Sequence, residues 1–221
     1  MSKDIKIASG EHLSKVWVLE PGKPVELPEN ITLEGDAKAD LVLVILPGVN
    51  CDQPLQVKVE GQYSEVNLSG LYLCNDDEKV KLNIELHHQV PNCTSHQLFK
   101  GIAAGKSHFN FYGKIIIAQD AQKTEAYQEN HNILLTDEAK VDTKPQLEIY
   151  ADDVKATHGA TIGRLNEEEQ FYMRSRGISE EDAKMLQMIS FVYPVIDKIT
   201  DQEEKERIAA IVEDSVRSIA R

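Results

Sequence analysis

The first 158 residues alternate apolar and polar side chains over short segments that are broken by turn residues. In residues 79–90 the alternation is clearest, because Val80, Leu82, Ile84 and Leu86 fall on one face of an extended chain. Similar runs recur at intervals of roughly 8–12 residues, separated by Pro-Gly, Glu-Gly, Ser-Gly and Asp-Asp signals. Since no segment there is long enough for a helical crossover, the pattern predicts an all-β body.

The alternation does not distinguish between the known all-β architectures. A sandwich, a jelly roll and a parallel β-helix share this texture, and the sequence has no strict short repeat of the kind that marks some solenoids. On physical grounds alone, a closed sandwich is the default expectation.

Residues 166–221 predict three helices with well-formed ends. Asn166 is an N-cap that is followed by three glutamates, and Ser179 caps a second helix that Pro194 should kink or end. Thr200, with an acid three positions later, forms a capping box for the third helix. We expect the apolar stripes to pack on one another and on the sheet. The alternative is that part of this surface docks a partner protein.

Composition and charge narrow the class of protein. The chain is 41% hydrophobic and 28% charged, as in ordinary globular proteins, and its formal net charge is −13. It has no clustered basic face, so nucleic acid and membrane surfaces are poor candidate partners. The N-terminus lacks the apolar run of a signal peptide, which favours the cytoplasm. Three cysteines without a CxxC pair indicate neither a disulfide framework nor a zinc knuckle.

One histidine-rich stretch raises a metal hypothesis. His87, His88, Cys93 and His96 lie within ten residues of one another, and imidazole and thiolate bind zinc and iron. The alternation places His88 on the Val80 face and His87 on the opposite one. Those two adjacent side chains therefore cannot chelate one ion together.

His158 lies where the extended pattern gives way to the helical one. Val154, Ala156 and His158 share one face of an extended run, and Gly159 follows. The histidine is a packed core residue, a metal or sulfur ligand, or a catalytic base. The sequence has no serine or cysteine nucleophile in a recognisable elbow, no Walker loop and no GxGxxG, so no defensible constellation supports an enzyme.

Residues 94–183 carry an ordered set of motifs that resembles a known family. The segments are "QLFKG", "AQKT", "KPQLEIYADDVK", "HGATIG" and "FYMRSRGI". In this order they resemble the C-terminal core of the SufB/SufD family of iron–sulfur cluster assembly proteins, and they are closer to its SufD branch.

The resemblance implies a fold and a role. The fold is a right-handed parallel β-helix over residues 1–160, followed by a small C-terminal helical domain over residues 161–221. The role is that of a scaffold without catalytic activity. It pairs through its β-helix with a SufB-like chain or with itself, and its helices dock a SufC-type ABC ATPase. No intrinsic cofactor is implied, only a transient iron–sulfur cluster at a subunit interface.

The same resemblance assigns candidate site residues. His158 matches the family histidine at the subunit interface, where a nascent cluster is built. His88 and Cys93 remain weak metal candidates. The expected ATPase-docking residues are Arg164, Phe171, Tyr172, Arg174, Arg176, Gly177 and Ile178.

Several positions depart from the family pattern. Ala156 stands where many relatives carry a cysteine, and His96 replaces a common arginine. The chain is about half the usual family length, and we expect it to lack the N-terminal helical domain. A homomeric β-helix adaptor that has lost cluster assembly is therefore an alternative. A metal-dependent enzyme that uses the His87–His96 stretch is a third, more distant option.

Overall fold

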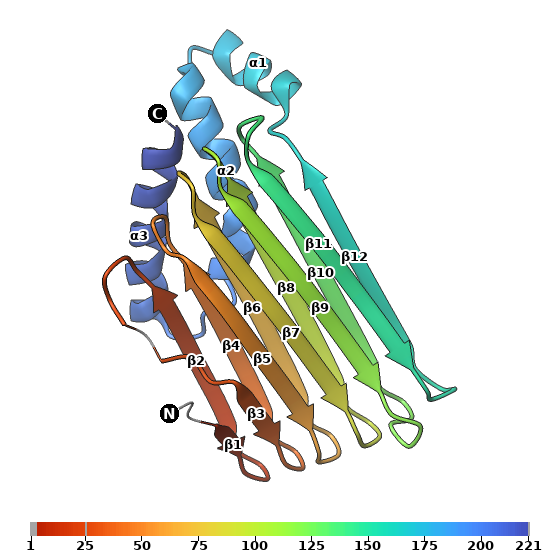
Figure 1. Cartoon of the computed structure of the whole chain (residues 1–221). Coiled ribbons are helices and arrows are strands. Elements are labelled where there is room, and N and C mark those ends of the chain that lie inside the picture. Colours follow the sequence, from red (N-terminus) through yellow and green to blue (C-terminus); the bar gives the residue numbers. More distant parts are fainter. Residues whose placement is uncertain (1–3, 25, 221) are drawn as a thin grey trace.

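The computed structural model describes residues 4–24 and 26–220, in which twelve strands precede three helices (Figure 1). The strands are β1 Ile5–Ile7, β2 His12–Leu19, β3 Asn30–Leu33, β4 Lys38–Ile45, β5 Cys51–Val59, β6 Glu65–Cys74, β7 Lys79–His88, β8 Thr94–Ala103, β9 His108–Ile117, β10 Glu125–Leu134, β11 Lys140–Ile149 and β12 Lys155–Gly163.

The strands form two parallel sheets between which the chain alternates. Sheet A has the order β1-β3-β5-β7-β9-β11, and sheet B has the order β12-β10-β8-β6-β4-β2. Each strand pairs in parallel with the strand two places later in the chain, so that one strand from each sheet makes one coil. This arrangement confirms the β-helix and replaces the default sandwich.

The apolar members of the alternating strands lie between the two sheets. Val80, Leu82, Ile84 and Leu86 are all buried there, as the alternation predicts. The polar members of sheet A point outward, where lysines and acids of neighbouring coils form ion pairs on the outer face of the sheet. Burial of one face therefore fixes the register of every strand.

The turn from sheet A to sheet B repeats in each of the first five coils. At this turn one residue adopts a left-handed conformation, with φ between 55° and 73°; the residues are Gly10, Asp36, Tyr63, Asn92 and Lys123. Their spacing lengthens from 26 residues (Gly10 to Asp36) to 31 (Asn92 to Lys123). Because both the residue type and the interval change, the coil leaves no repeated motif in the sequence.

The three helices begin close to the predicted caps. They are α1 Glu167–Ser175, α2 Glu180–Ile196 and α3 Gln202–Ala220. The Asn166 side chain accepts the backbone N–H groups of Glu168 and Glu169, and Ser179 accepts that of Asp182. Pro194 lies inside helix α2, which ends two residues later, so the proline does not itself end the helix.

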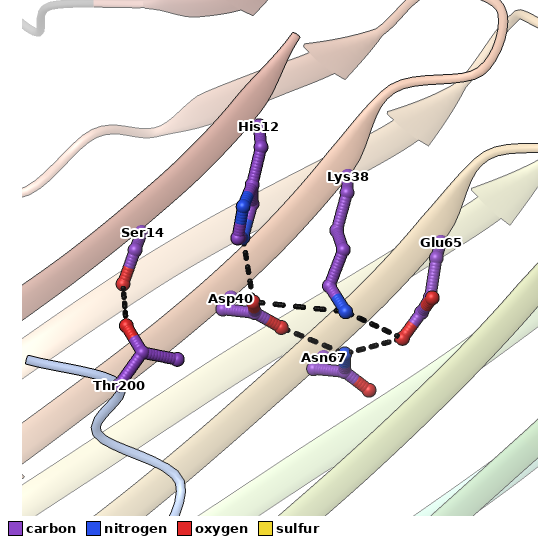
Figure 2. Close-up of polar contacts among 7 residues, drawn as sticks. All are labelled: His12, Ser14, Lys38, Asp40, Glu65, Asn67 and Thr200. Carbon is purple, nitrogen blue, oxygen red and sulfur yellow. Dashed lines mark hydrogen bonds and ion pairs between the residues drawn. The ribbon is translucent and has the colours of Figure 1, made fainter. Parts of the chain in front are cut away.

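The predicted cap of the third helix is wrong by one residue. The Asp201 carboxylate, not the Thr200 hydroxyl, accepts the backbone N–H of Glu204, at 2.7 Å. A carboxylate is favoured there because it also faces the positive end of the helix dipole. The Thr200 hydroxyl instead lies 2.7 Å from Ser14 Oγ and ties the α2–α3 loop to β2 (Figure 2).

Helices α2 and α3 cover the outer face of sheet B (Figure 1). Val42 and Val44 of β4, Leu71 of β6 and Ile102 of β8 form one apolar cluster with Met188, Val192, Val195, Ile196, Ile199, Ile208, Val212 and Val216. Strand β4 is thus buried on both faces, which explains its continuous apolar run. The expectation that the helices pack on one another and on the sheet is confirmed for α2 and α3, whereas α1 has no buried residue.

Replacing Gly101 with alanine should strongly destabilise the solenoid. A Cβ at Gly101 would lie 1.6 Å from Tyr72 Cε2, and Tyr72 is held in place because its hydroxyl donates to Asn132. We expect Gly101→Ala to lower the free energy of unfolding by roughly 3 kcal/mol, measured in urea. Gly159→Ala is the matched control, because its Cβ would meet nothing within 4 Å. Equal stabilities of the two variants would contradict this packing.

Candidate functional site

Strand β12 ends sheet B, and His158 lies at its middle. Within the described residues, β12 pairs only with β10, so that its other edge is open. His158 is exposed there. The interpretation of His158 as a packed core residue is therefore wrong, because no further described coil covers it. A ligand or a partner chain can reach the imidazole from the open edge.

The neighbours of His158 connect it to the interior. Val154 and Ala156 are partly buried and pack against the core between the sheets, as their shared face predicts. In register, His158 lies next to Gln128 of β10, which in turn lies next to Gln97 of β8. We call this row the His158 column; it consists of Lys15, Leu41, Leu68, Gln97, Gln128 and His158.

The two glutamines of the His158 column are buried polar side chains. Gln97 is 2% exposed and Gln128 is 1% exposed. Gln128 Nε2 donates to Gln97 Oε1 at 3.0 Å, whereas Gln97 Nε2 and Gln128 Oε1 have no partner among the described residues. The sequence reasoning missed both. The available signal was their position on the otherwise apolar face of alternating strands.

Most of the predicted ATPase-docking residues gather on α1 and the turn that follows it. Helix α1 has no buried residue, and Phe171 and Tyr172 are 74% and 59% exposed. The Arg176 guanidinium lies 5.3 Å from the centre of the Tyr172 ring, and Arg174 lies 3.7 Å from the Glu180 carboxylate. The helix thus presents aromatic and basic side chains together on an uncovered surface.

The α1–α2 turn is fixed by Gly177 and Ile178. Gly177 has φ = 89°, and the backbone N–H of Ile178 donates to the carbonyl oxygen of Met173 at 3.2 Å. This geometry closes the end of a helix and suits glycine. Arg164 lies apart, on the link from β12 to α1, where it forms an ion pair of 2.6 Å with Asp137.

An open groove of about 750 Å³ runs between α1 and α2. It is lined by Asn166, Glu169, Tyr172, Met173, Leu186 and Phe191 among others. Tyr172 and Leu186 are exposed apolar side chains at this groove. Its mixed apolar and acidic lining suits a protein segment better than a small charged metabolite.

The fold agrees with comparisons to known proteins. Residues 28–191 match the SufBD core domain of SUF-system iron–sulfur cluster assembly. The chain belongs to the SufBD family.

Relatives of the chain include several SufBD proteins. It is 34% identical over 208 residues to the iron–sulfur cluster assembly protein SufD of Escherichia coli, covering 93% of this chain and 49% of that protein. It is 31% identical over 217 residues to a SufBD family protein of Mycobacterium leprae, with coverages of 94% and 55%. The chain spans about half the length of the curated relatives that it matches.

In this SufBD chain, the side chains of the histidine-rich stretch point to three different places. His87 lies on the outer face of sheet A, 3.2 Å from the Glu85 carboxylate, and His96 stacks on Tyr127 on the outer face of sheet B. His88 points into the interior. The three histidines therefore cannot bind one ion. The part of the chain that the structure describes contains no group of three or more metal-ligating side chains.

The weak metal candidates His88 and Cys93 are both buried. Cys93 Sγ donates to the carbonyl oxygen of Gly61 at 3.3 Å, and burial raises the pKa of its thiol. His88 Nε2 lies 2.9 Å from Ser95 Oγ. Both side chains thus have structural partners in the core.

A second polar cluster lies on the outer face of sheet B in the first coils (Figure 2). The Asp40 carboxylate lies 2.7 Å from His12 Nε2 and accepts from Asn67 Nδ2 at 2.7 Å. Nucleophilic catalysis would require a serine hydroxyl bonded to the imidazole. Ser14 is bonded to Thr200 instead. The cluster therefore does not resemble a catalytic triad, and the separate Ser14–Thr200 bond ties the helical loop to the sheet.

None of the helices in the described ranges combines the length and apolar character needed to cross a membrane.

His88 should make stability depend on pH between 8 and 5. Burial lowers the pKa of His88 from 6.5 to about 4, so that its neutral form is favoured in the folded state. This contribution is complete above pH 6.5 and is lost as the pH falls toward 4, because only the unfolded state takes up the proton. We expect the His88 contribution to be about 2 kcal/mol smaller at pH 5 than at pH 8.

The measurement compares urea unfolding of the wild type and His88→Gln at both pH values. The variant should lack that part of the pH dependence, whereas the exposed control His158→Gln should retain it. An identical pH dependence in the wild type and His88→Gln would show that His88 is not buried as a neutral group.

Proposed function

We propose that this chain is a non-catalytic, SufD-like scaffold subunit of an iron–sulfur cluster assembly complex. The observation that carries the proposal is the open edge of β12, which exposes His158 at the end of a SufBD β-helix. In this role the chain pairs through the β-helix with a SufB-like chain and docks a SufC-type ABC ATPase through α1 and the following turn. The iron–sulfur cluster is its cargo, not a resident cofactor.

The backbone of β12 supports pairing at this edge. Lys155 donates its backbone N–H inward, to the carbonyl oxygen of Thr124 at 2.9 Å. Because N–H directions alternate along a strand, the N–H groups of Ala156, His158, Ala160 and Ile162 point to the open edge. Ile162 is 46% exposed, and on β11 Ile149 is 42% exposed. An unpaired edge with apolar side chains favours strand addition by another chain.

His158 is the candidate cluster-site residue on this edge. A neutral imidazole binds iron, and a partner chain that pairs with β12 would bring its own side chains next to His158. Ala156, which faces the core two residues earlier, supplies no thiolate. The partner must therefore provide the sulfur ligands of a cluster built here.

Helix α1 is the proposed docking site for the ATPase. Phe171 and Tyr172 supply exposed aromatic anchors, and Arg174 and Arg176 supply positive charge beside them. Aromatic and arginine side chains dominate the energetics of protein interfaces. The groove between α1 and α2 offers a concave surface next to these anchors.

The alternative is a homomeric β-helix adaptor that has lost cluster assembly. The open edge of β12 favours this candidate as well, because strand pairing between two copies needs no side-chain ligand. A stable homodimer that excludes a SufB-like chain would support the adaptor and contradict the scaffold.

Proline at position 160 should disrupt pairing without disturbing β10. The N–H of Ala160 points to the open edge, so Ala160→Pro removes an edge donor and leaves the β10–β12 bonds in place. We expect a dissociation constant for the paired chains at least about tenfold higher. Sedimentation with and without a SufB-like chain measures this, with Ala160→Val as control. If both variants sediment with the same molecular masses as the wild type, with and without the SufB-like chain, edge pairing is contradicted.

Charge reversal on α1 should weaken ATPase binding. Arg174→Glu with Arg176→Glu replaces two exposed positive charges by negative ones, and we expect affinity for the cognate SufC-type ATPase to fall by about tenfold or more. Pull-down and titration calorimetry under reducing conditions measure this. Arg217→Glu is the control, because Arg217 is exposed on α3 and not on α1 or the turn that follows α1. Absence of any complex with the wild type would reject ATPase docking.

A further inference from the structure

The His158 column contains a buried polar group without a partner at its last interior position. Gln128 is 1% exposed, and its Oε1 has no donor among the described residues. A buried acceptor without a donor destabilises the folded state. Such an atom in an otherwise well-packed core points to a missing donor.

The direction of the amide ladder indicates where that donor must lie. Gln128 Nε2 donates back to Gln97 Oε1 at 3.0 Å, so the amide nitrogen of Gln128 points toward β8. The carboxamide is planar, with oxygen and nitrogen on opposite sides of its axis. Since the amide nitrogen is engaged with β8, the strand left to supply a donor within sheet B is β12, the other neighbour of β10.

His158 is the next residue of the column in that direction. Parallel pairing places His158 beside Gln128, at the strand spacing of about 4.8 Å. Its flanking interior positions are Ala156 and Ala160, which have no side-chain donor. Thr143 Oγ1, on β11, is also buried and unpartnered, and its hydroxyl is the competing donor.

We propose that Gln128 is a positioning residue for His158. In this structure the two side chains are in register but no hydrogen bond joins them. When the exposed imidazole turns toward the interior, one of its N–H groups donates to Gln128 Oε1, which selects a single neutral tautomer and directs the lone pair of the other ring nitrogen to the open edge. Metal-binding histidines are commonly oriented in this way by an acceptor behind them. This inference rests on the proposed role of His158 and adds the residue that prepares its imidazole for iron.

Nitrogen NMR of the histidine side chains tests the proposal on the isolated full chain. The spectra are recorded at pH 8, because the two tautomers are distinguished in the neutral imidazole. We expect the wild type to show the nitrogen shifts of one tautomer, and Gln128→Leu to show averaged shifts of two. Leucine is a suitable replacement, because Leu41 and Leu68 occupy the same column. A His158→Asn spectrum assigns the signals.

Two controls separate positioning from general disturbance of the core. Ser95→Ala removes a buried hydrogen-bonding group from the neighbouring β8 position and should leave the His158 shifts unchanged. Thr143→Val removes the competing donor and should likewise leave them unchanged. A shift toward averaged values in Thr143→Val would overturn the assignment of the Gln128 oxygen to His158.

Averaged shifts in the wild type, or identical shifts in the wild type and Gln128→Leu, would also overturn the proposal. The wild-type spectrum tests the proposal even if Gln128→Leu fails to fold, because averaged shifts in the wild type would by themselves overturn it. With a SufB-like partner present, Gln128→Leu should further weaken Fe(II) binding by roughly tenfold. Failure of the partner to bind would reject the proposed function, whereas the tautomer measurement on the single chain would still decide the role of Gln128.

Discussion

Parallel pairing between successive coils determines what every interior side chain contacts. Each residue lies about 4.8 Å from its counterpart in the coils before and after, so a large side chain in one coil limits its neighbour in the next. Tyr72 is in register with Gly101, and Phe99 is in register with Gly70. A Cβ at Gly70 would lie 2.4 Å from Phe99 Cδ1. Large and small residues therefore alternate along a column, and the aromatic core depends on these two glycines.

The same stacking changes the character of the core toward the open end. In the His158 column, Leu41 and Leu68 give way to Gln97 and Gln128. The hydrogen bond between the two amides satisfies two of their four side-chain polar atoms, and Gln97 Nε2 and Gln128 Oε1 are left without a partner among the described residues. A column of apolar side chains can end at any coil without leaving a polar atom unpaired. A column of amides leaves an unpaired polar atom at its end unless the next residue supplies a hydrogen-bonding group.

The sequence predicts the local elements well because they depend on local chemistry. Alternation identifies the strands, and the caps at Asn166 and Ser179 are correct because a side-chain oxygen satisfies the first helical N–H groups. The closing of the strands into coils could not be derived from the pattern. The left-handed turn is occupied by a different residue type in successive coils, as at Gly10, Asp36 and Tyr63, so no repeat is visible in the sequence. The β-helix is therefore predicted from the family resemblance alone.

The exposure of His158 was equally hidden, because the burial of an alternating residue depends on whether another coil follows. Gln97 and Gln128 escaped attention for a related reason. A single glutamine in an alternating strand does not reveal that its counterpart in the next coil is also a glutamine. That information appears only once the register is known. Sites that are formed between coils are therefore harder to predict than sites formed within one segment.

The two uncovered surfaces of the molecule are joined by a short link. Only residues 164–166 separate the end of β12 from the start of α1, and Leu165 packs against the cluster under the helices. The ion pair between Arg164 and Asp137 holds the first link residue to the β10–β11 turn. A three-residue link that is anchored at two points has little slack. A displacement of α1 would therefore strain this link or move β12, the edge strand that carries His158.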